Sequence, residues 1–237
     1  MKRKTHGLTA VSILGPTTEE AKQQLLEASR LGVDVAELRL DRMEETCRIF
    51  FLTSLVVLSR MYHLRFILTY RRKTHGGAPG ITNAVSFLFW VELFRDFPMA
   101  VSTASWIDWE FELVQELQGR SVLEGISIPW AKIIVSMHDF KKTPANLALF
   151  GKFRKMLASP AGVVKVACLS QGARNNRRLF RLYESSDKPL IVIGMGEHGL
   201  ETRMRFREFP NALLMFGRLG HHGSAPGQPL VSELIAT

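Results

Sequence analysis

The chain has 237 residues, of which 46% are hydrophobic, and a formal net charge of +9, which allows one large α/β domain or two small ones with a sizeable core. The longest apolar stretches, 49–58 and 84–90, are too short to cross a bilayer and no signal peptide is visible, so we expect no membrane partner. The basic residues are scattered, and the densest run, 174–178, lacks the interleaved aromatic residues of a single-strand binder; we therefore expect no nucleic-acid partner, and an anionic small molecule is also compatible with the charge.

Short apolar runs, each followed by a turn and a helical stretch, repeat along the whole chain. The runs are 8–14, 33–40, 64–70, 104–109, 133–137, 163–167, 190–194 and 212–216. Most of them are spaced by about 25–30 residues, the length of a strand–helix unit. Between them lie amphipathic stretches, such as 18–31, which begins after Thr17 and stops at Gly32, and 170–185.

Eight such units without an internal linker predict an α/β fold, a single-domain (β/α)8 TIM barrel over residues 1–237. The fourth strand, within the crowded segment 87–109, has the least clear boundaries. Cys47 and Cys168 are far apart and match no metal-binding spacing. We expect both to be reduced packing residues of a cytoplasmic protein.

Polar residues recur at alternate positions of the predicted strands and therefore share one face of each. They are Glu37, Arg39 and Asp41; Thr69 and Arg71; Ser136 and His138; and Lys165, which is flanked by outward-facing valines. The outer face of a barrel packs on helices and must be apolar. These polar side chains should therefore point into the barrel, near the carboxyl ends of the strands, where barrel active sites are built.

Lys165 is the most informative of these residues, because it lies within an apolar run. Burial disfavours the charged ammonium, so this side chain is a candidate for a neutral, nucleophilic amine that forms an imine with a ketone. Arg39 and Arg71 would disfavour a further positive charge beside it, and His138 titrates near neutrality and can move a proton. A purely structural ion pair of Glu37, with Arg39 or with Lys165, remains open.

At this point the chain resembles type I 3-dehydroquinate dehydratase, or dehydroquinase. The matching segments follow the family order: 37–41, 69–71, 136–140 with 142–144, 164–167, 195–203 and 224–228. The resemblance implies a lyase of the shikimate pathway, in aromatic amino-acid biosynthesis. Its small-molecule substrate would be 3-dehydroquinate, dehydrated by syn elimination to 3-dehydroshikimate with no metal and no diffusible cofactor.

The resemblance also assigns a role to each candidate residue. Lys165 would form the Schiff base with the ring ketone, and His138 would abstract the proton next to the imine and then protonate the departing hydroxyl. Arg203 would bind the substrate carboxylate through its planar fork. The expected ligands of the ring hydroxyls are Glu37, Arg39 and Arg71, and those from a loop that closes over the substrate are Ser224 and Gln228. A homodimer is the implied assembly.

Two features depart from the family pattern. His75 stands where the family usually carries a glutamate that pairs with the catalytic histidine, so we expect a slower enzyme or a shifted pH optimum. The chain stops at Thr237, nine residues past Gln228, which is short for a closing helix. This end resembles the junction in plant and chlamydial proteins where the domain is fused to shikimate dehydrogenase, so an excised first domain and a short stand-alone form both remain open.

Two other functions stay open from the sequence. A class I Schiff-base aldolase would also use a lysine on the sixth strand, although it would share neither His138 nor the 224–228 segment. A catalytically impaired basic barrel acting as a binding protein is the second, because His75 lacks the usual carboxylate. The segment 194–199 spells GxGxxG, but a lone match of this kind is a weak indication of a nucleotide site.

Overall fold

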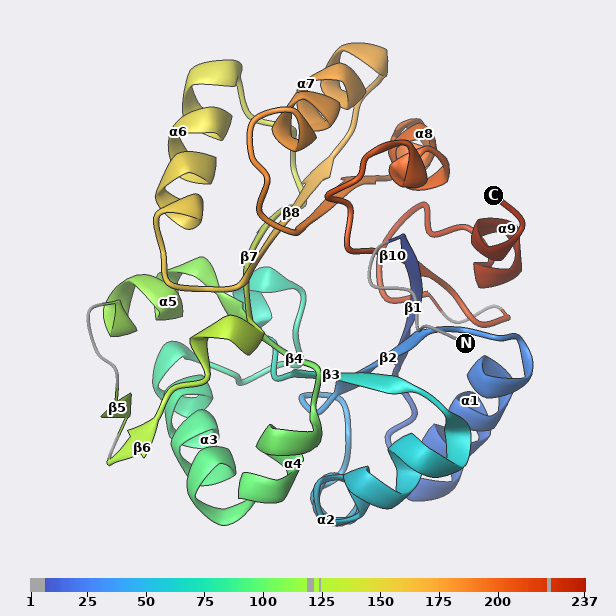
Figure 1. The fold of residues 1–237 in the computed structure, drawn as a ribbon, viewed down its shortest axis with the longest axis vertical. Helices are drawn as coiled ribbons and strands as arrows, with labels where there is room; N and C mark the ends of the chain where they lie inside the picture. The colour runs from blue at the N-terminus through green and yellow to red at the C-terminus, as the bar shows by residue number, and fades with distance from the viewer. Residues whose placement is uncertain (1–6, 119–121, 124, 221–222) are drawn as a thin grey trace.

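The computed structural model describes residues 7–118, 122–123, 125–220 and 223–237. The predicted domain 1–237 also includes 1–6, 119–121, 124 and 221–222, which lie outside the described residues. Eight parallel strands form one sheet in the order β10-β1-β2-β3-β4-β7-β8-β9. The sheet curves into a barrel with helices around it (Figure 1), so the predicted (β/α)8 fold is confirmed.

Each of the eight apolar runs overlaps one barrel strand. The strands are β1 (Leu8–Ile13), β2 (Val35–Arg39), β3 (Arg65–Thr69), β4 (Trp106–Glu110), β7 (Ile133–Asp139), β8 (Val163–Leu169), β9 (Leu190–Met195) and β10 (Leu214–Gly217). The helices are α1 (Thr18–Arg30), α2 (Glu45–Tyr62), α3 (Asn83–Asp96), α4 (Pro98–Thr103), α5 (Phe111–Leu117), α6 (Asn146–Leu157), α7 (Ala173–Tyr183), α8 (Leu200–Met204) and α9 (Val231–Ile235). The short two-stranded ribbon of β5 (Val122–Leu123) and β6 (Ile126–Ser127) lies outside the barrel sheet. Four 3-10 turns complete the described elements: η1 (Lys73–His75), η2 (Trp130–Lys132), η3 (Glu197–Gly199) and η4 (Phe206–Glu208).

The barrel is nearly closed between its seventh and eighth strands. β9 and β10 are joined by a single bridge, Leu190 with Ala212. Leu190 donates its N–H to the carbonyl of Asn211 at 2.8 Å, and its own carbonyl accepts from Leu213 at 2.8 Å. The neighbouring pair β8–β9 is in register over six residues, so the β9–β10 seam has far fewer backbone contacts between its strands.

Local chemistry explains where several elements begin and end. The hydroxyl of Thr17 and the carboxylate of Glu20 form a reciprocal capping box at the start of α1, and Gly32 follows its end at φ +74°. Pro98 opens α4 directly after α3. The predicted fourth strand began at Ala104, but the N–H of that residue still bonds to Ala100 at the end of α4. β4 therefore starts two residues later and runs on to Glu110.

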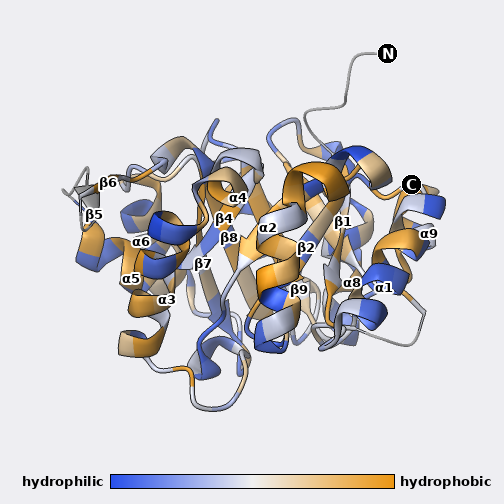
Figure 2. Cartoon of the chain, turned by 90° about the horizontal axis from the view of Figure 1, so that it is seen from below, coloured by the Kyte–Doolittle hydropathy of each residue, from blue (hydrophilic) through white to orange (hydrophobic). Residues whose placement is uncertain are grey.

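The apolar core lies between the outer face of the strands and the helices. Hydrophobic residues are dense in both layers (Figure 2). Trp90 of α3 packs its ring against Trp109 of β4 at 5.9 Å between centroids. Cys47 and Cys168 are free and buried, as expected of packing residues. Among the helices that the structure describes, none combines the length and the apolarity needed to traverse a bilayer.

Candidate active site

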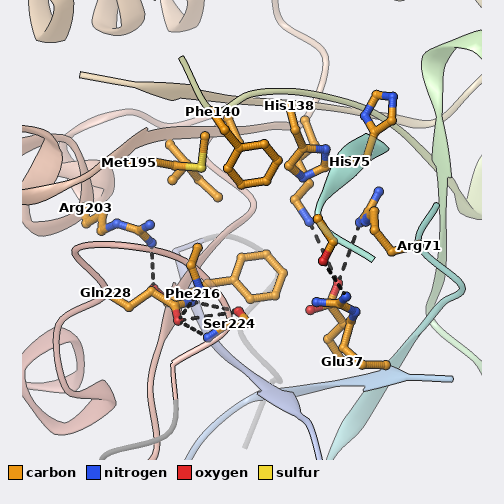
Figure 3. A pocket seen from close by; sticks show the side chains of 16 residues that line it. Glu37, Arg71, His75, His138, Phe140, Met195, Arg203, Phe216, Ser224 and Gln228 are labelled. Atoms are coloured by element: carbon orange, nitrogen blue, oxygen red, sulfur yellow. Dashed lines mark hydrogen bonds and ion pairs between the residues drawn. The ribbon is translucent and has the colours of Figure 1, made fainter. Parts of the chain in front are cut away.

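A pocket opens at the carboxyl ends of the barrel strands and holds about 560 Å³ of empty space, part of it open to solvent (Figure 3). All eight candidate residues named from the sequence line this pocket. They are Glu37, Arg39, Arg71, His138, Lys165, Arg203, Ser224 and Gln228. Residues from both ends of the chain thus meet in one place. The alternation along the strands predicted an inward position for Glu37, Arg39, Arg71, His138 and Lys165, whereas Arg203, Ser224 and Gln228 were expected only from the family resemblance.

Asp108, which the sequence analysis missed, lies at the centre of the buried charges. Its Oδ2 accepts from Nζ of Lys165 at 2.9 Å and lies 2.8 Å from Nη2 of Arg71. Its Oδ1 accepts from Nη1 of Arg71 at 3.0 Å and from the Ser136 hydroxyl at 2.6 Å. Burial alone would raise the pKa of Asp108, but the charges of Arg71 and Lys165 hold it well below the usual range. Asp108 therefore stays a carboxylate and fixes the positions of both cations.

Lys165 is 5% exposed and lies inside the barrel. Besides Asp108, its amine lies 3.8 Å from Oε1 of Glu37 and 4.5 Å from the centre of the Phe216 ring. Arg39 instead donates two hydrogen bonds of 2.8 Å to Asp41. The carboxylate that contacts the amine most closely is therefore Asp108, and the guanidinium of Arg39 is engaged elsewhere.

His138 and Lys165 come from neighbouring strands, β7 and β8. In the register of these strands, Ser136 pairs with Lys165 and His138 pairs with Ala167. The imidazole therefore lies on the same inward face as the amine, two positions closer to the mouth of the pocket. Burial holds the pKa of His138 well below its usual range, and the charges of Arg71 and Lys165 act in the same direction. A neutral imidazole in this position can accept a proton.

Arg203 lies on the opposite side of the pocket from Glu37 and Arg71 (Figure 3). It is fully buried, and its Nη1 donates to the carbonyl of Phe216 at 3.0 Å. Within the described part of the chain, its Nε and Nη2 are buried without a hydrogen-bond partner. Burial lowers the pKa of Arg203 to about 10, so the group is still charged at neutral pH. Two unpaired donors on one planar guanidinium fit a bound carboxylate.

The segment 224–228 closes one wall of the pocket. Oε1 of Gln228 accepts from the backbone N–H of Ser224 at 2.6 Å, and Nε2 of Gln228 donates to the hydroxyl of Ser224 at 3.1 Å. The segment rests on the end of β9, because Gly196 donates its N–H to the carbonyl of Pro226 at 3.1 Å. Gly227 has φ +69°, and a Cβ there would come within 2.4 Å of the backbone of Gly196. Only glycine fits at this contact.

His75 also lines the pocket, on η1 directly after β3. Its ring meets that of His138 edge to face, with centroids 5.9 Å apart. Its Nε2 lies 3.3 Å from Oε2 of Glu112, a residue that the sequence analysis did not consider. The folded chain therefore places the carboxylate of Glu112 beside His75, although the residue at position 75 is not itself acidic.

Two further sequence motifs can be placed. The glycines of 194–199 form a tight turn after β9, where a Cβ on Gly199 would come within 2.3 Å of Gly194. Close backbone packing thus accounts for these glycines. Among the described residues, no group of three or more His, Cys, Asp or Glu side chains is arranged to hold a metal ion. The site instead combines an amine, a base and a free guanidinium, a set suited to imine chemistry on a keto acid.

Comparison with known proteins agrees with this geometry. A family model described as type I 3-dehydroquinase matches residues 9–237. The 3-dehydroquinate dehydratase of Enterococcus faecalis is 26% identical over 233 residues, which cover 94% of this chain and 88% of that protein. The chloroplastic bifunctional 3-dehydroquinate dehydratase/shikimate dehydrogenase of Arabidopsis thaliana is 27% identical, and the match covers 98% of this chain but 37% of that protein.

The solved structures give the same result for the fold. The crystal structure of 3-dehydroquinate dehydratase from Geobacillus kaustophilus superposes with a TM-score of 0.78 at 21% sequence identity. That alignment covers 97% of this chain and 88% of the other. Nearly the whole described barrel therefore has a counterpart in that structure.

Proposed function

The chain belongs to the type I 3-dehydroquinase family, and we propose that it is a lyase that converts 3-dehydroquinate to 3-dehydroshikimate by eliminating water. The observation that carries this proposal is the position of Lys165, whose amine lies inside the barrel on the strand next to that of His138. The unpaired donors of Arg203 face the same pocket and suit the carboxylate of such a substrate.

In the proposed reaction, the neutral His138 takes a proton from Lys165, and the freed amine attacks the ring ketone. His138 returns this proton to the former ketone oxygen, which leaves as water, so that Lys165 is joined to the substrate as an iminium. His138 removes a proton from the adjacent carbon, and the electron pair of that C–H bond moves toward the iminium nitrogen. The resulting enamine expels the hydroxyl group, which takes a proton from His138 and leaves as water. Hydrolysis of the new imine then releases the product and restores the amine.

The remaining pocket residues bind and enclose the substrate in this proposal. Glu37, Arg39 and Arg71 orient the ring hydroxyls, and Ser224 and Gln228 cover them from the closing segment. Asp108 keeps Lys165 and Arg71 in place before the substrate arrives. A homodimer and a cytoplasmic location stay predictions. Because relatives such as the Arabidopsis protein are bifunctional, a shikimate dehydrogenase unit in the same polypeptide is compatible with the proposal.

One experiment separates this function from the two alternatives. We expect incubation with 3-dehydroquinate to raise the ultraviolet absorbance as the conjugated product forms, and borohydride to trap a reduced adduct on the Lys165 peptide in a mass spectrum. An adduct with an aldol substrate but none with 3-dehydroquinate would indicate the aldolase. The absence of turnover and of any adduct would leave the binding protein.

The Gly227→Ala variant tests whether the closing segment binds substrate. The new Cβ meets the backbone of Gly196, so the segment must move away from the pocket. We expect KM for 3-dehydroquinate to rise by about tenfold or more, since small displacements of positioning groups have large kinetic effects. Steady-state kinetics and a thermal melt check this result.

Gly80→Ala is the matched control for that variant. Gly80 has φ +86°, but nothing lies within 4 Å of its would-be Cβ. It therefore carries the same backbone strain without the steric contact. Equal values of KM in the two variants would show that the packing of 224–228 on Gly196 does not matter for binding.

A further inference from the structure

The edge-to-face contact of His75 and His138 leaves two buried nitrogen atoms without partners. The Nδ1 atoms of both rings have no hydrogen bond within the described part of the chain, while the ring centroids are 5.9 Å apart. A buried polar atom without a partner costs free energy, and native structures contain few of them. The two Nδ1 atoms do not bond to each other in this structure. They would satisfy each other if the adjacent rings turned toward one another, with a proton on one nitrogen and a lone pair on the other.

Glu112 decides which nitrogen of His75 carries the proton. It lies in the first turn of α5, with Oε2 3.3 Å from Nε2 of His75. The hydrogen bond with His75 helps to hold the pKa of Glu112 well below its usual range, so the group is a carboxylate and can only accept. The proton of a neutral His75 then lies on Nε2, and its Nδ1 keeps a lone pair.

Two cations also contact this cluster. Nη2 of Arg72 lies 2.9 Å from Oε2 of Glu112 and 3.4 Å from Nε2 of His75. Nζ of Lys152 lies 3.3 Å from Oε1 of Glu112. The guanidinium makes its shorter contact with the carboxylate, so Glu112 is its main partner in this cluster. The Nε2–H of a neutral His75 is therefore left to Glu112.

We propose that Glu112 is a positioning residue for the dehydration: it holds His75 in the tautomer whose Nδ1 accepts a hydrogen bond from Nδ1–H of His138 when the two rings turn toward each other during the reaction. This inference rests on the proposed function. When His138 takes the proton from the substrate carbon on its Nε2, it becomes an imidazolium. His75 then stabilises that cation by accepting from its Nδ1–H, with the charge of Glu112 at the far end. No proton has to reach Glu112, as in other carboxylate–histidine pairs of this kind.

A double-mutant comparison tests this arrangement. We expect Glu112→Gln to lower kcat by about tenfold or more with little change in KM, because the imidazolium exists only after substrate has bound. A glutamate introduced by His75→Glu presents its own carboxylate to His138, so Glu112→Gln should cause no loss of kcat in that background. Glu116→Gln, an exposed carboxylate one turn further along α5, is the matched control and should not change the kinetics.

The pH profile separates positioning from a general structural effect. His138 faces Arg71, Lys165, Asp108 and His75, and Arg72 and Lys152 lie behind His75 at Glu112. Glu112→Gln removes one negative charge from this set and makes the imidazolium less stable. The acidic limb of kcat should therefore move to lower pH, whereas a structural defect would scale kcat equally at every pH.

A readout that does not depend on turnover completes the test. Long-range 1H–15N correlation spectra of the wild-type protein should show His75 protonated at Nε2, and Glu112→Gln should weaken that preference. Protonation at Nδ1 in the wild type, or an equal loss of kcat in both backgrounds, would overturn the inference. Failure to convert 3-dehydroquinate would instead reject the proposed function, and the spectra would still decide whether Glu112 sets the tautomer.

Discussion

Replacing Lys165 with methionine should abolish both turnover of 3-dehydroquinate and the borohydride adduct, with kcat/KM falling by about 10⁴-fold or more. Methionine has a similar length and no amine, so it can fill the space without forming an imine. Asp108 keeps its two contacts with Arg71 and the hydroxyl of Ser136, which should preserve the fold. Steady-state kinetics measures the turnover, peptide mass spectrometry detects the adduct, and circular dichroism checks the fold.

Lys155→Met is the control for the loss of a lysine. Lys155 is exposed on α6, away from the pocket lining, and its replacement should leave turnover unchanged. Substantial turnover by a correctly folded Lys165→Met protein would rule out a covalent route through this amine. A borohydride adduct on a different lysine of the Lys165→Met protein would also show that the covalent route does not depend on Lys165.

His138→Asn should separate the two halves of the reaction. Asparagine cannot take and return a proton, so we expect kcat to fall by about 10³-fold, within the range for removal of a general acid–base. The imine on Lys165 should still form, more slowly, because the amine and Arg203 are intact. Stopped-flow absorbance and borohydride trapping on the same sample give both rates.

The matched control for this variant is His63→Asn. His63 is exposed and has φ 57°, a left-handed conformation that asparagine tolerates well. We expect the His63→Asn protein to dehydrate 3-dehydroquinate at the wild-type rate. A His138→Asn protein that dehydrates its substrate at the wild-type rate would show that another group moves the proton, and His75 would be the next residue to replace.

The fold was predictable because each strand is an apolar run of its own and the helices between them carry end signals, such as the Thr17–Glu20 capping box. The polar side chains that point into the barrel were predictable because they alternate with apolar residues along single strands. Asp108 satisfies the same rule, since it alternates with Ile107 and Trp109 in β4. It was missed because the boundaries of this strand are unclear within the crowded segment 87–109, so the alternation along it was not considered.

Glu112 could not be found in this way. It lies on a helix rather than on a strand, and its partner His75 lies in a 3-10 turn after a different strand. No periodicity links two such positions, and only the closed barrel brings them together.

The C-terminal segment was expected to be short for a helix that closes the barrel. α9 is a single turn, yet it packs against β1 and β10, with Val231 where Gly217 leaves room and with Leu234 also buried.

The single bridge between β9 and β10 has a mechanical consequence for the pocket. Lys165 and His138 stand on strands tied to their neighbours by continuous ladders, which resist distortion. Arg203 and the 224–228 segment belong to the chain on either side of the seam, where fewer backbone hydrogen bonds join the neighbouring strands. If the proposed function holds, we expect the wall formed by Arg203 and 224–228 to move more readily than the strands that carry the amine and the imidazole.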